Sequence, residues 1–248
     1  MPTEPGEDTE KSCDCPDSVC SVYSVGMSWT EQRIYFIDFE GSTSSGIVEY
    51  GVVELLAGEI ETVHTRLCRP TGRLRREDVA VHGLDEPDLI DAEPLTADFG
   101  LFAAWRESGP LAAHFAGAEN SLLKSVWPYP RSSPDFARPG KQVAEWGPWI
   151  DTGALYRQVY PQFSSYKLAD LVQACGLQTE LDELAAGYCP AERRRYHAAP
   201  YDALAGAVLL RALAREPQLA GLSIMQVLAL STLDGEKRDA LQQGNLFD

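Results

Sequence analysis

Two carboxylates, Asp38 and Glu40, stand two positions apart at the end of a bulky, mostly apolar run over residues 33–39. The run predicts a buried β-strand, and because side chains alternate between the faces of a strand, both carboxylates point to the same side. Two like charges there are unfavourable unless a positive charge lies between them. A divalent cation meets this need, since Mg²⁺ binds a few carboxylate oxygens and otherwise keeps water. The simpler alternative is a strand that ends in a loop with two solvated acids.

A third acidic side chain, Glu119, follows another short apolar run. Residues 110–115 predict a second buried strand, which ends close to His114. Glu119 lies in the first turn of a helix predicted over residues 118–126. An acid at this place can also serve only to complement the helix macrodipole, so Glu119 alone decides nothing.

An imidazole and a fourth carboxylate occur together towards the C-terminus. His197 lies in a predicted loop, and Asp202 opens an amphipathic helix predicted over residues 200–215. The alternatives are a surface histidine and an acid that complements the macrodipole. Asp151 is a further candidate, and we expect it to cap the helix over residues 152–160 rather than to act on a substrate.

Periodicity along the rest of the chain predicts a mixed β-sheet flanked by helices. Strands are predicted over residues 33–39, 47–56, 59–68 and 110–115, with a further strand end at 149–150. Helices are predicted over residues 96–107, 118–126, 152–160, 166–175 and 200–215. The Ala57-Gly58 connection is short enough to suggest an antiparallel hairpin. Residues 127–149 contain several Pro, Gly and Trp residues and predict a long loop or insertion.

Composition bounds the class of protein. The chain has 248 residues, of which 44% are hydrophobic, and this suits one domain of moderate size with appended tails. A net charge of −16 argues against a general nucleic-acid coat protein, because such proteins bind by neutralising phosphates. It does not exclude an enzyme that grips a few nucleotides. Arginines cluster between residues 66 and 76, where a phosphate track and a solvated loop are equally good interpretations, and again at 193–195.

The N-terminal residues 1–30 predict a disordered leader, because they hold six acids and one lysine among Ser, Pro and Gly. Cys13, Cys15 and Cys20 cluster there without a nearby His or fourth Cys, so we expect reduced thiols in preference to a metal site. No apolar run approaches the roughly 20 residues that span a bilayer, and no secretory signal is visible. A cytoplasmic protein that does not use a membrane is the simplest expectation.

The order of these stretches resembles that of the DEDD superfamily of 3′–5′ exonucleases, in its histidine-containing, DnaQ-like branch. Three stretches resemble its motifs in the family's order, namely residues 36–40, 114–119 and 197–202. Residues 81–84 (Val-His-Gly-Leu) and 151–152 (Asp-Thr) are weaker similarities. The resemblance covers about residues 33–215. It implies an α/β, ribonuclease H-like fold, with a mixed β-sheet flanked by helices in a single exonuclease domain over residues 31–220.

The chain departs from the family's pattern in two places. Gly41, Ser42 and Thr43 stand where the family usually has two threonine-like residues and then Gly. The second motif usually ends in Asp, whereas this chain has Glu119. The extra methylene moves the carboxylate by about one C–C bond, and a misplacement of about 1 Å can lower a rate about 10²-fold. Because the family's acid acts partly through water, the resemblance implies activity with an altered metal preference.

By resemblance the chain would use two divalent ions, Mg²⁺ or Mn²⁺, which clamp the attacking and leaving oxygens of an in-line displacement. Asp38 would bridge both ions. Glu40 and Asp202 would complete the site of the ion that activates water, and Glu119 would serve the other. His197 would act as the general base, since an imidazole can take a proton near neutral pH.

The substrate implied is the 3′ end of single-stranded DNA, whose free terminal base can wedge against apolar side chains. An RNA-trimming exonuclease is the open alternative, because contacts to the 2′-OH cannot be recognised in the sequence. The candidates for substrate contact are Thr43, His82, Leu84 and Phe115. Phe39 points away from Asp38 and Glu40, so we expect it in the core.

Residues 221–248 predict a C-terminal helix and tail. Gln243, Leu246 and Phe247 resemble the Gln-x-x-Leu-Phe peptide with which bacterial replication and repair proteins bind the sliding clamp, although an ordinary tail is equally compatible. Clamp binding would place the protein in DNA replication or repair and raise its effective concentration at DNA ends. The alternative from another class is a non-catalytic nucleic-acid- or clamp-binding module, which Glu119 favours and the intact remaining acids oppose.

Overall fold

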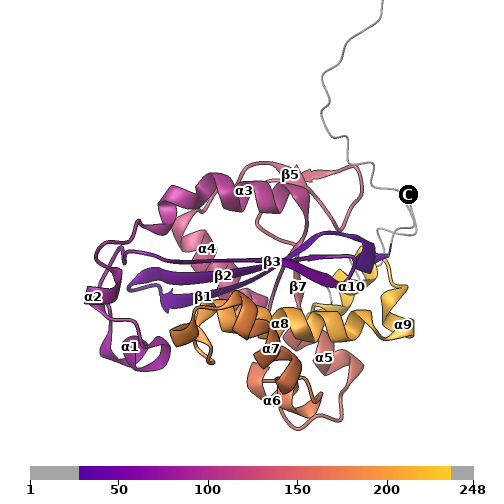
Figure 1. Ribbon diagram of the computed structural model, residues 1–248. Helices are drawn as coiled ribbons and strands as arrows, with labels where there is room; N and C mark the ends of the chain where they lie inside the picture. The colour runs from indigo at the N-terminus through magenta and orange to yellow at the C-terminus, as the bar shows by residue number, and fades with distance from the viewer. Residues whose placement is uncertain (1–27, 236–248) are drawn as a thin grey trace, which may run out of the picture.

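A five-stranded mixed sheet runs through the middle of the computed structural model, which describes residues 28–235 (Figure 1). The strand order is β3-β2-β1-β4-β7. β1 is antiparallel to β2 and parallel to β4, β2 is antiparallel to β3, and β4 is parallel to β7. The strands are β1 (Ile34–Ser42), β2 (Gly46–Leu56), β3 (Glu59–Leu67), β4 (Leu111–Ala113) and β7 (Trp149–Asp151). The predicted mixed sheet and its β2–β3 hairpin are confirmed.

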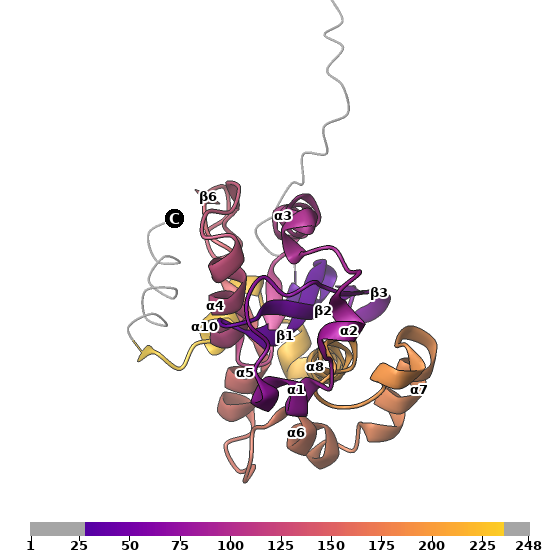
Figure 2. The same ribbon diagram turned by 90° about the vertical axis from the view of Figure 1, so that its left-hand side faces the viewer.

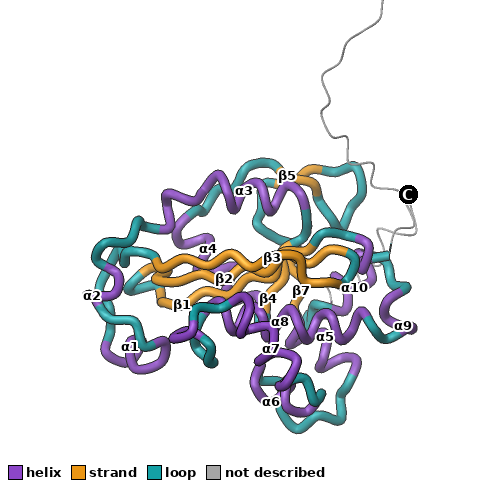
Figure 3. Tube along the Cα trace, viewed as in Figure 1, coloured by secondary structure: helices purple, strands orange, loops and turns teal. Residues whose placement is uncertain are grey.

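Helices cover both faces of this sheet, as Figure 3 shows. They are α1 (Arg76–His82), α2 (Glu86–Leu89), α3 (Phe99–Ser108), α4 (Ala116–Val126), α5 (Thr152–Val159), α6 (Leu168–Ala174), α7 (Gln178–Tyr188), α8 (Ala199–Ala214), α9 (Pro217–Ala220) and α10 (Ile224–Leu230). The described residues also form three 3₁₀ turns, η1 (Trp29–Glu31), η2 (Leu95–Asp98) and η3 (Ala191–Arg193). The described residues form a single domain around the sheet.

β1 is buried on both faces because its alternating side chains enter two different cores. Ile34 and Phe36 pack in the cluster that includes α5, α6, α7 and α8. Tyr35, Ile37 and Phe39 pack in the other cluster, with aromatic side chains of α3 and of the segment after α4. The strand is therefore held rigidly up to Glu40, where its register against β2 shifts.

α8 lies in direct contact with the sheet because two glycines leave room for it. Gly51, on β2 opposite Asp38, has space for no side chain: a Cβ there would lie 2.2 Å from the carbonyl oxygen of Ala199. Gly206 within α8 faces Phe36, whose ring would lie 2.1 Å from an added Cβ. The start of α8 is thereby set against the two central strands, next to the carboxyl end of β1.

The predicted long loop at residues 127–149 contains a two-stranded sheet of β5 (Ser133–Pro134) and β6 (Gln142–Val143). Trp146 within it is fully buried. Arg106 of α3 is also fully buried and anchors the segment. Its guanidinium donates hydrogen bonds of 2.7 to 3.2 Å to the backbone carbonyls of Pro134, Glu145 and Gly147. A charged side chain of α3 is thus part of the core.

The predicted helices agree with α4, α5, α6 and α8, and the one over residues 96–107 is divided into η2 and α3.

Trp29 lies inside the predicted leader, yet it is buried and its indole donates a 2.7 Å hydrogen bond to the Leu219 carbonyl. The cysteine cluster before residue 28 and the clamp-like peptide at 243–247 lie outside the described residues. Within residues 28–235, no helix combines the length and the apolar character needed to cross a membrane.

Candidate active site

The carboxyl end of β1 presents Asp38 and Glu40 on the face of the sheet that α8 covers. They pair in register with Gly51 and Glu49 of β2. Phe39 between them points to the opposite side and stacks with Phe102 at a ring-centroid distance of 5.9 Å. Its prediction as a core residue is confirmed, and the two acids are left facing the start of α8.

Glu119 and Asp202 reach the same place from two helix starts. The Glu119 carboxylate is buried, and its Oε2 accepts a hydrogen bond of 3.1 Å from the backbone N–H of Phe39, between the two strand acids. Asp202 lies in the first turn of α8, and its Oδ2 accepts a hydrogen bond of 3.0 Å from the backbone N–H of His197. The predicted acids therefore converge on one spot.

Three of the predicted residues are close enough to one another to bind the same metal ion. One donor atom from each of Glu40, His197 and Asp202 lies within 4.8 Å of the others. The His197 side chain is exposed, and its backbone has a φ of 62°. The loop therefore holds the imidazole at the open side of the acidic cluster.

Burial and mutual repulsion raise the pKa values of all four carboxyl groups. For Asp38 the rise is large, with burial as the main cause and the charges of the neighbouring acids next. Burial is also the first cause for Glu40 and Glu119, whose pKa values rise to about 8, and for Asp202, whose pKa rises to about 7. Because the ionised forms are disfavoured without a counter-charge, the cluster suits a cation.

The donor set also fits a hard divalent cation. Four carboxylates offer oxygen ligands of the kind that Mg²⁺ and Mn²⁺ prefer. The Oδ1 atom of Asp202 is buried and has no hydrogen-bond partner within the described residues. A buried oxygen of this sort is costly unless something coordinates it.

The raised pKa values predict that the metal-free protein loses stability between about pH 6.5 and about pH 8. In this window the folded chain holds protons on Glu40, Glu119 and Asp202 that the unfolded chain has released, so raising the pH favours unfolding. Three histidines with lowered folded-state pKa values act in the opposite direction, but only near the lower end of this window, because the unfolded chain releases their protons as the pH passes 6.5. Thermal unfolding in chelator should show the midpoint falling with pH, and excess Mg²⁺ should raise it more at the upper end.

Glu40→Gln supplies the control for this prediction. Removing one group with a raised pKa should reduce the fall of the unfolding midpoint with pH. A midpoint that stays level or rises across the window in the metal-free wild type would contradict the raised carboxyl pKa values.

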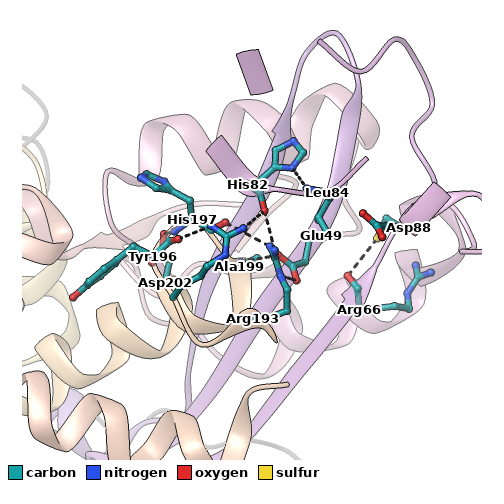
Figure 4. A network of polar contacts seen from close by, with 12 residues as sticks. Glu49, Arg66, His82, Leu84, Asp88, Arg193, Tyr196, His197, Ala199 and Asp202 are labelled. Atoms are coloured by element: carbon teal, nitrogen blue, oxygen red, sulfur yellow. Dashed lines mark hydrogen bonds and ion pairs between the residues drawn. The ribbon is translucent and has the colours of Figure 1, made fainter. Parts of the chain in front are cut away.

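A fifth buried carboxylate, Glu49, was not predicted from the sequence. Arg193 of η3 binds it through Nε at 2.9 Å and Nη2 at 2.5 Å, and the backbone N–H of Ala199 donates to it at 2.9 Å (Figure 4). Both members of this ion pair are buried. Arg193 also donates to the carbonyl oxygen of His82 at 2.8 Å. The loop before α8 is thereby fastened to β2 and to the end of α1.

A signal for this pair is present in the sequence. Glu49 is one of two charges, with Glu54, in a mostly apolar strand, and a buried charge requires a partner. Sequence patterning cannot say which of three successive arginines at 193–195 supplies it.

Aromatic and amide groups brace the other side of the His197 loop. Tyr196 and Tyr201 pack edge to face with ring centroids 5.1 Å apart. The Tyr201 hydroxyl donates to Asp182 Oδ1 at 2.9 Å and accepts from the Gln178 amide, also at 2.9 Å. These contacts with α7 and the Glu49–Arg193 pair hold His197 between two fixed supports.

The four candidates for substrate contact surround the cluster to different degrees. Thr43 is exposed in the turn after β1, and Phe115 at the start of α4 is 44% exposed. His82 and Leu84 are buried, and Leu84 packs against Val48 and Leu89. The His82 Nδ1 accepts a 3.1 Å hydrogen bond from the N–H of Leu84, whereas its buried Nε2 has no partner among residues 28–235. Their roles stay predictions.

Asp151 caps α5, as predicted. Its Oδ1 accepts a hydrogen bond of 3.1 Å from Ala154 N–H. The same carboxylate accepts from the N–H groups of Phe115 and Ala116, so it also fixes the start of α4. His114, in the second motif, is buried and bonded to Thr152 Oγ1 and the Tyr166 carbonyl, away from the acids.

Comparison with known proteins gives matches among solved structures. No protein-family model and no curated protein sequence matches the chain. Exonuclease X in complex with 5′ overhanging duplex DNA is 22% identical with a TM-score of 0.55, over 79% of this chain and 99% of that chain. The nuclease domain of 3′hExo, a DEDDh family member bound to rAMP, is 17% identical with a TM-score of 0.55, over 78% and 97%. E. coli Exonuclease I in complex with a dT13 oligonucleotide is 12% identical with a TM-score of 0.56, over 76% of this chain and 42% of its own.

Because the sequence identities are between 12% and 22%, the similarity establishes the fold alone. The α/β, ribonuclease H-like architecture expected from the sequence, a mixed sheet flanked by helices, is therefore confirmed.

Proposed function

We propose, from the premise that this chain has the ribonuclease H-like fold of DEDDh 3′–5′ exonucleases, that it is itself a metal-dependent 3′–5′ exonuclease acting on single-stranded DNA. The observation that carries the proposal is the convergence of four acids, three buried and Asp38 partly buried, with His197 at the carboxyl end of β1. A set of like charges with raised pKa values and an adjoining exposed imidazole is typical of a catalytic site.

The acids would hold two divalent cations, Mg²⁺ or Mn²⁺. Asp38 would contact both, Glu40 and Asp202 would complete one site, and Glu119 would serve the other. When bound, the cations would supply Lewis-acid stabilisation of the charge on the transferring phosphoryl group. The Phe39 N–H fixes Glu119 Oε2, so the longer arm of Glu has a defined position.

His197 would act as the general base. Its exposed imidazole takes the proton of a water molecule whose oxygen forms the new bond to phosphorus. The bond from phosphorus to the 3′ oxygen of the preceding nucleotide then breaks, and that oxygen takes up a proton. A nucleoside 5′-monophosphate leaves, and the shortened strand keeps a 3′-hydroxyl. The backbone hydrogen bond from His197 to Asp202 keeps base and acid together during this step.

A single-stranded end is proposed as the substrate because the exposed ring of Phe115 offers a free terminal base an apolar wall. DNA is the first candidate because two neighbours of known structure, Exonuclease X and Exonuclease I, are bound to DNA. Thr43, Leu84 and the unpartnered Nε2 of His82 are proposed as further contacts. The clamp-like residues Gln243, Leu246 and Phe247 would add a tether in replication or repair. An exoribonuclease is the second candidate, supported by a neighbour of known structure, a 3′-exonuclease that recognises the histone mRNA stem-loop.

The test is a gel assay on 5′-labelled single-stranded DNA and RNA of one sequence, with Mg²⁺ and then Mn²⁺. We expect a ladder that shortens from the 3′ end, absent in Asp38→Ala and unchanged in Glu183→Ala, an exposed acid on α7. The ratio of DNA to RNA cleavage decides the substrate. Glu119→Asp should retain cleavage and change the ratio of Mg²⁺ to Mn²⁺ activity.

No cleavage of either strand with either metal, in wild type and in Glu119→Asp, would overturn the catalytic proposal. A catalytically impaired nucleic-acid- or clamp-binding module would then be the better interpretation.

A further inference from the structure

The arginine segment, residues 69–76, runs from the end of β3 to the first residue of α1 and holds four exposed arginines in a chain of net charge −16. They are Arg69, Arg73, Arg75 and Arg76. None of their guanidinium groups has an ion pair, hydrogen bond or ring contact within residues 28–235. These four positive charges are available to a ligand.

The other described arginines are all engaged. Six form ion pairs with carboxylates, namely Arg33, Arg66, Arg138, Arg193, Arg211 and Arg215. Arg106, Arg194 and Arg195 bind backbone carbonyls, and Arg131 and Arg157 lie over aromatic rings. An acidic protein that pairs its remaining arginines and leaves one cluster free offers that cluster to an anionic partner.

The backbone of the arginine segment is fixed to the turn that follows β1. The N–H groups of Thr71 and Gly72 donate to the Ser45 carbonyl at 2.9 and 3.2 Å, and Ser44 Oγ donates to the Arg73 carbonyl at 3.1 Å. A Cβ at Gly72 would lie 2.1 Å from the Ser44 carbonyl oxygen, so the two backbones are in contact. This turn comes directly after Asp38 and Glu40, and the arginines therefore stand on a support shared with the acids.

α1 links the segment to the other side of the site. Its seven residues, from Arg76 to His82, cover about 10 Å. At its end the His82 carbonyl accepts from both Arg193 and Arg195, beside the His197 loop. Figure 2 shows the molecule from the side on which α1 and α2 lie. The turn after β1 and α1 thus connect the arginine segment to both sides of the site.

Two acids follow the arginines directly, and neither neutralises them through an ion pair. Asp78 accepts a 2.9 Å hydrogen bond from Ser42 Oγ, which ties α1 to the end of β1. Glu77 is exposed in the first turn of α1, where the helix macrodipole favours an acid.

We propose that the arginine segment binds the phosphodiester backbone of the nucleic-acid strand outside the catalytic site. The proposal rests on the proposed exonuclease function. A guanidinium matches a phosphate with two parallel hydrogen bonds, and each neutralised phosphate releases counterions that favour binding. Local basic contacts of this kind let an acidic protein grip a strand.

The test measures binding of a labelled single strand about 20 nucleotides long by fluorescence anisotropy, in an Asp38→Ala background that prevents cleavage. Arg73→Gln/Arg75→Gln/Arg76→Gln should weaken binding at least tenfold. The slope of log K against log salt concentration should fall by about 0.7 for each phosphate that the variant no longer neutralises, or about 2 in total. Arg138→Gln/Lys141→Gln/Lys167→Gln removes the same charge from other surfaces and should leave the slope unchanged.

A second measurement separates this proposal from the proposed function. The p-nitrophenyl ester of thymidine 5′-monophosphate has a single phosphodiester, so it offers no second phosphate for the segment to bind. With Asp38 intact, the arginine variant should hydrolyse it at the wild-type kcat/KM, while kcat/KM on the long strand falls at least tenfold. Equal decreases on both substrates, or the same decrease of affinity in the control variant, would overturn the proposal. Wild-type protein that hydrolyses neither substrate would refute the exonuclease function, and anisotropy would still decide the arginine segment.

Discussion

Replacing His197 with Asn is expected to lower kcat on single-stranded DNA by about 10²–10⁴-fold, the usual contribution of a general base. The fold should be unaffected. His197 has a φ of 62°, a left-handed conformation that Asn tolerates better than most residues. The hydrogen bond to Asp202 comes from the backbone N–H, which the substitution keeps. Because the side chain is exposed, the substitution leaves the packing of the core intact.

Single-turnover rates and thermal unfolding together check this expectation. His197→Ala should be as slow as His197→Asn but less stable by about 1–2 kcal/mol, because Ala disfavours the left-handed region. His197→Gly accepts that backbone conformation and leaves an open space, so added imidazole should restore part of its rate. A His197→Asn enzyme within about threefold of the wild-type rate would assign the proton transfer to another group.

Glu49→Gln should destabilise the folded protein by about 3–5 kcal/mol, because it leaves the buried Arg193 guanidinium without its counter-charge. Gln also provides one oxygen where the carboxylate serves both Arg193 and the Ala199 N–H. The substitution should also loosen the start of α8. Asp202 would then be less well ordered, and activity should fall for that reason. Urea unfolding measures the decrease in stability directly.

A double-mutant cycle makes this second prediction sharp. Glu49→Leu/Arg193→Met replaces the pair with apolar side chains and should recover much of the stability that either single change removes. The reason is that a buried ion pair seldom stabilises a protein more than well-packed apolar side chains of similar volume do. Glu145→Gln is the control, because its ion pair with Lys124 is exposed on both sides. It should cost no more than about 1 kcal/mol. A Glu49→Gln destabilisation no larger than this control would show that the pair is not structurally important.

The order of the acids along the chain could be predicted because each stands where a strand ends or a helix begins. The apolar runs that end at Asp38 and near His114 are local patterns, and so is the helical spacing after Glu119 and Asp202. Local patterns of this length are sufficient to locate elements. The common edge of β1 and β4 then follows from their parallel pairing.

The supports of the site could not be predicted, because they depend on partners that are far apart in the chain. Glu49 and Arg193 are separated by 144 residues, and only the packed structure shows that they meet. The buried Arg106 takes its partners from backbone carbonyls, which carry no side-chain signal. The sequence left the arginine segment undecided between a phosphate track and a solvated loop, since the absence of a partner is a property of the fold.

The position of η3 and α8 late in the chain also has a consequence for the order in which the site is assembled during synthesis. β1 and α4 leave the ribosome long before η3 and α8, so the first three acids are synthesised without His197, Asp202 or the arginine that fastens their loop. A nascent chain that ends before residue 190 therefore lacks His197 and one acid of the cluster. Under the proposed function, hydrolytic capacity would arrive with the last third of the domain, and an incomplete chain would not attack nearby RNA or DNA.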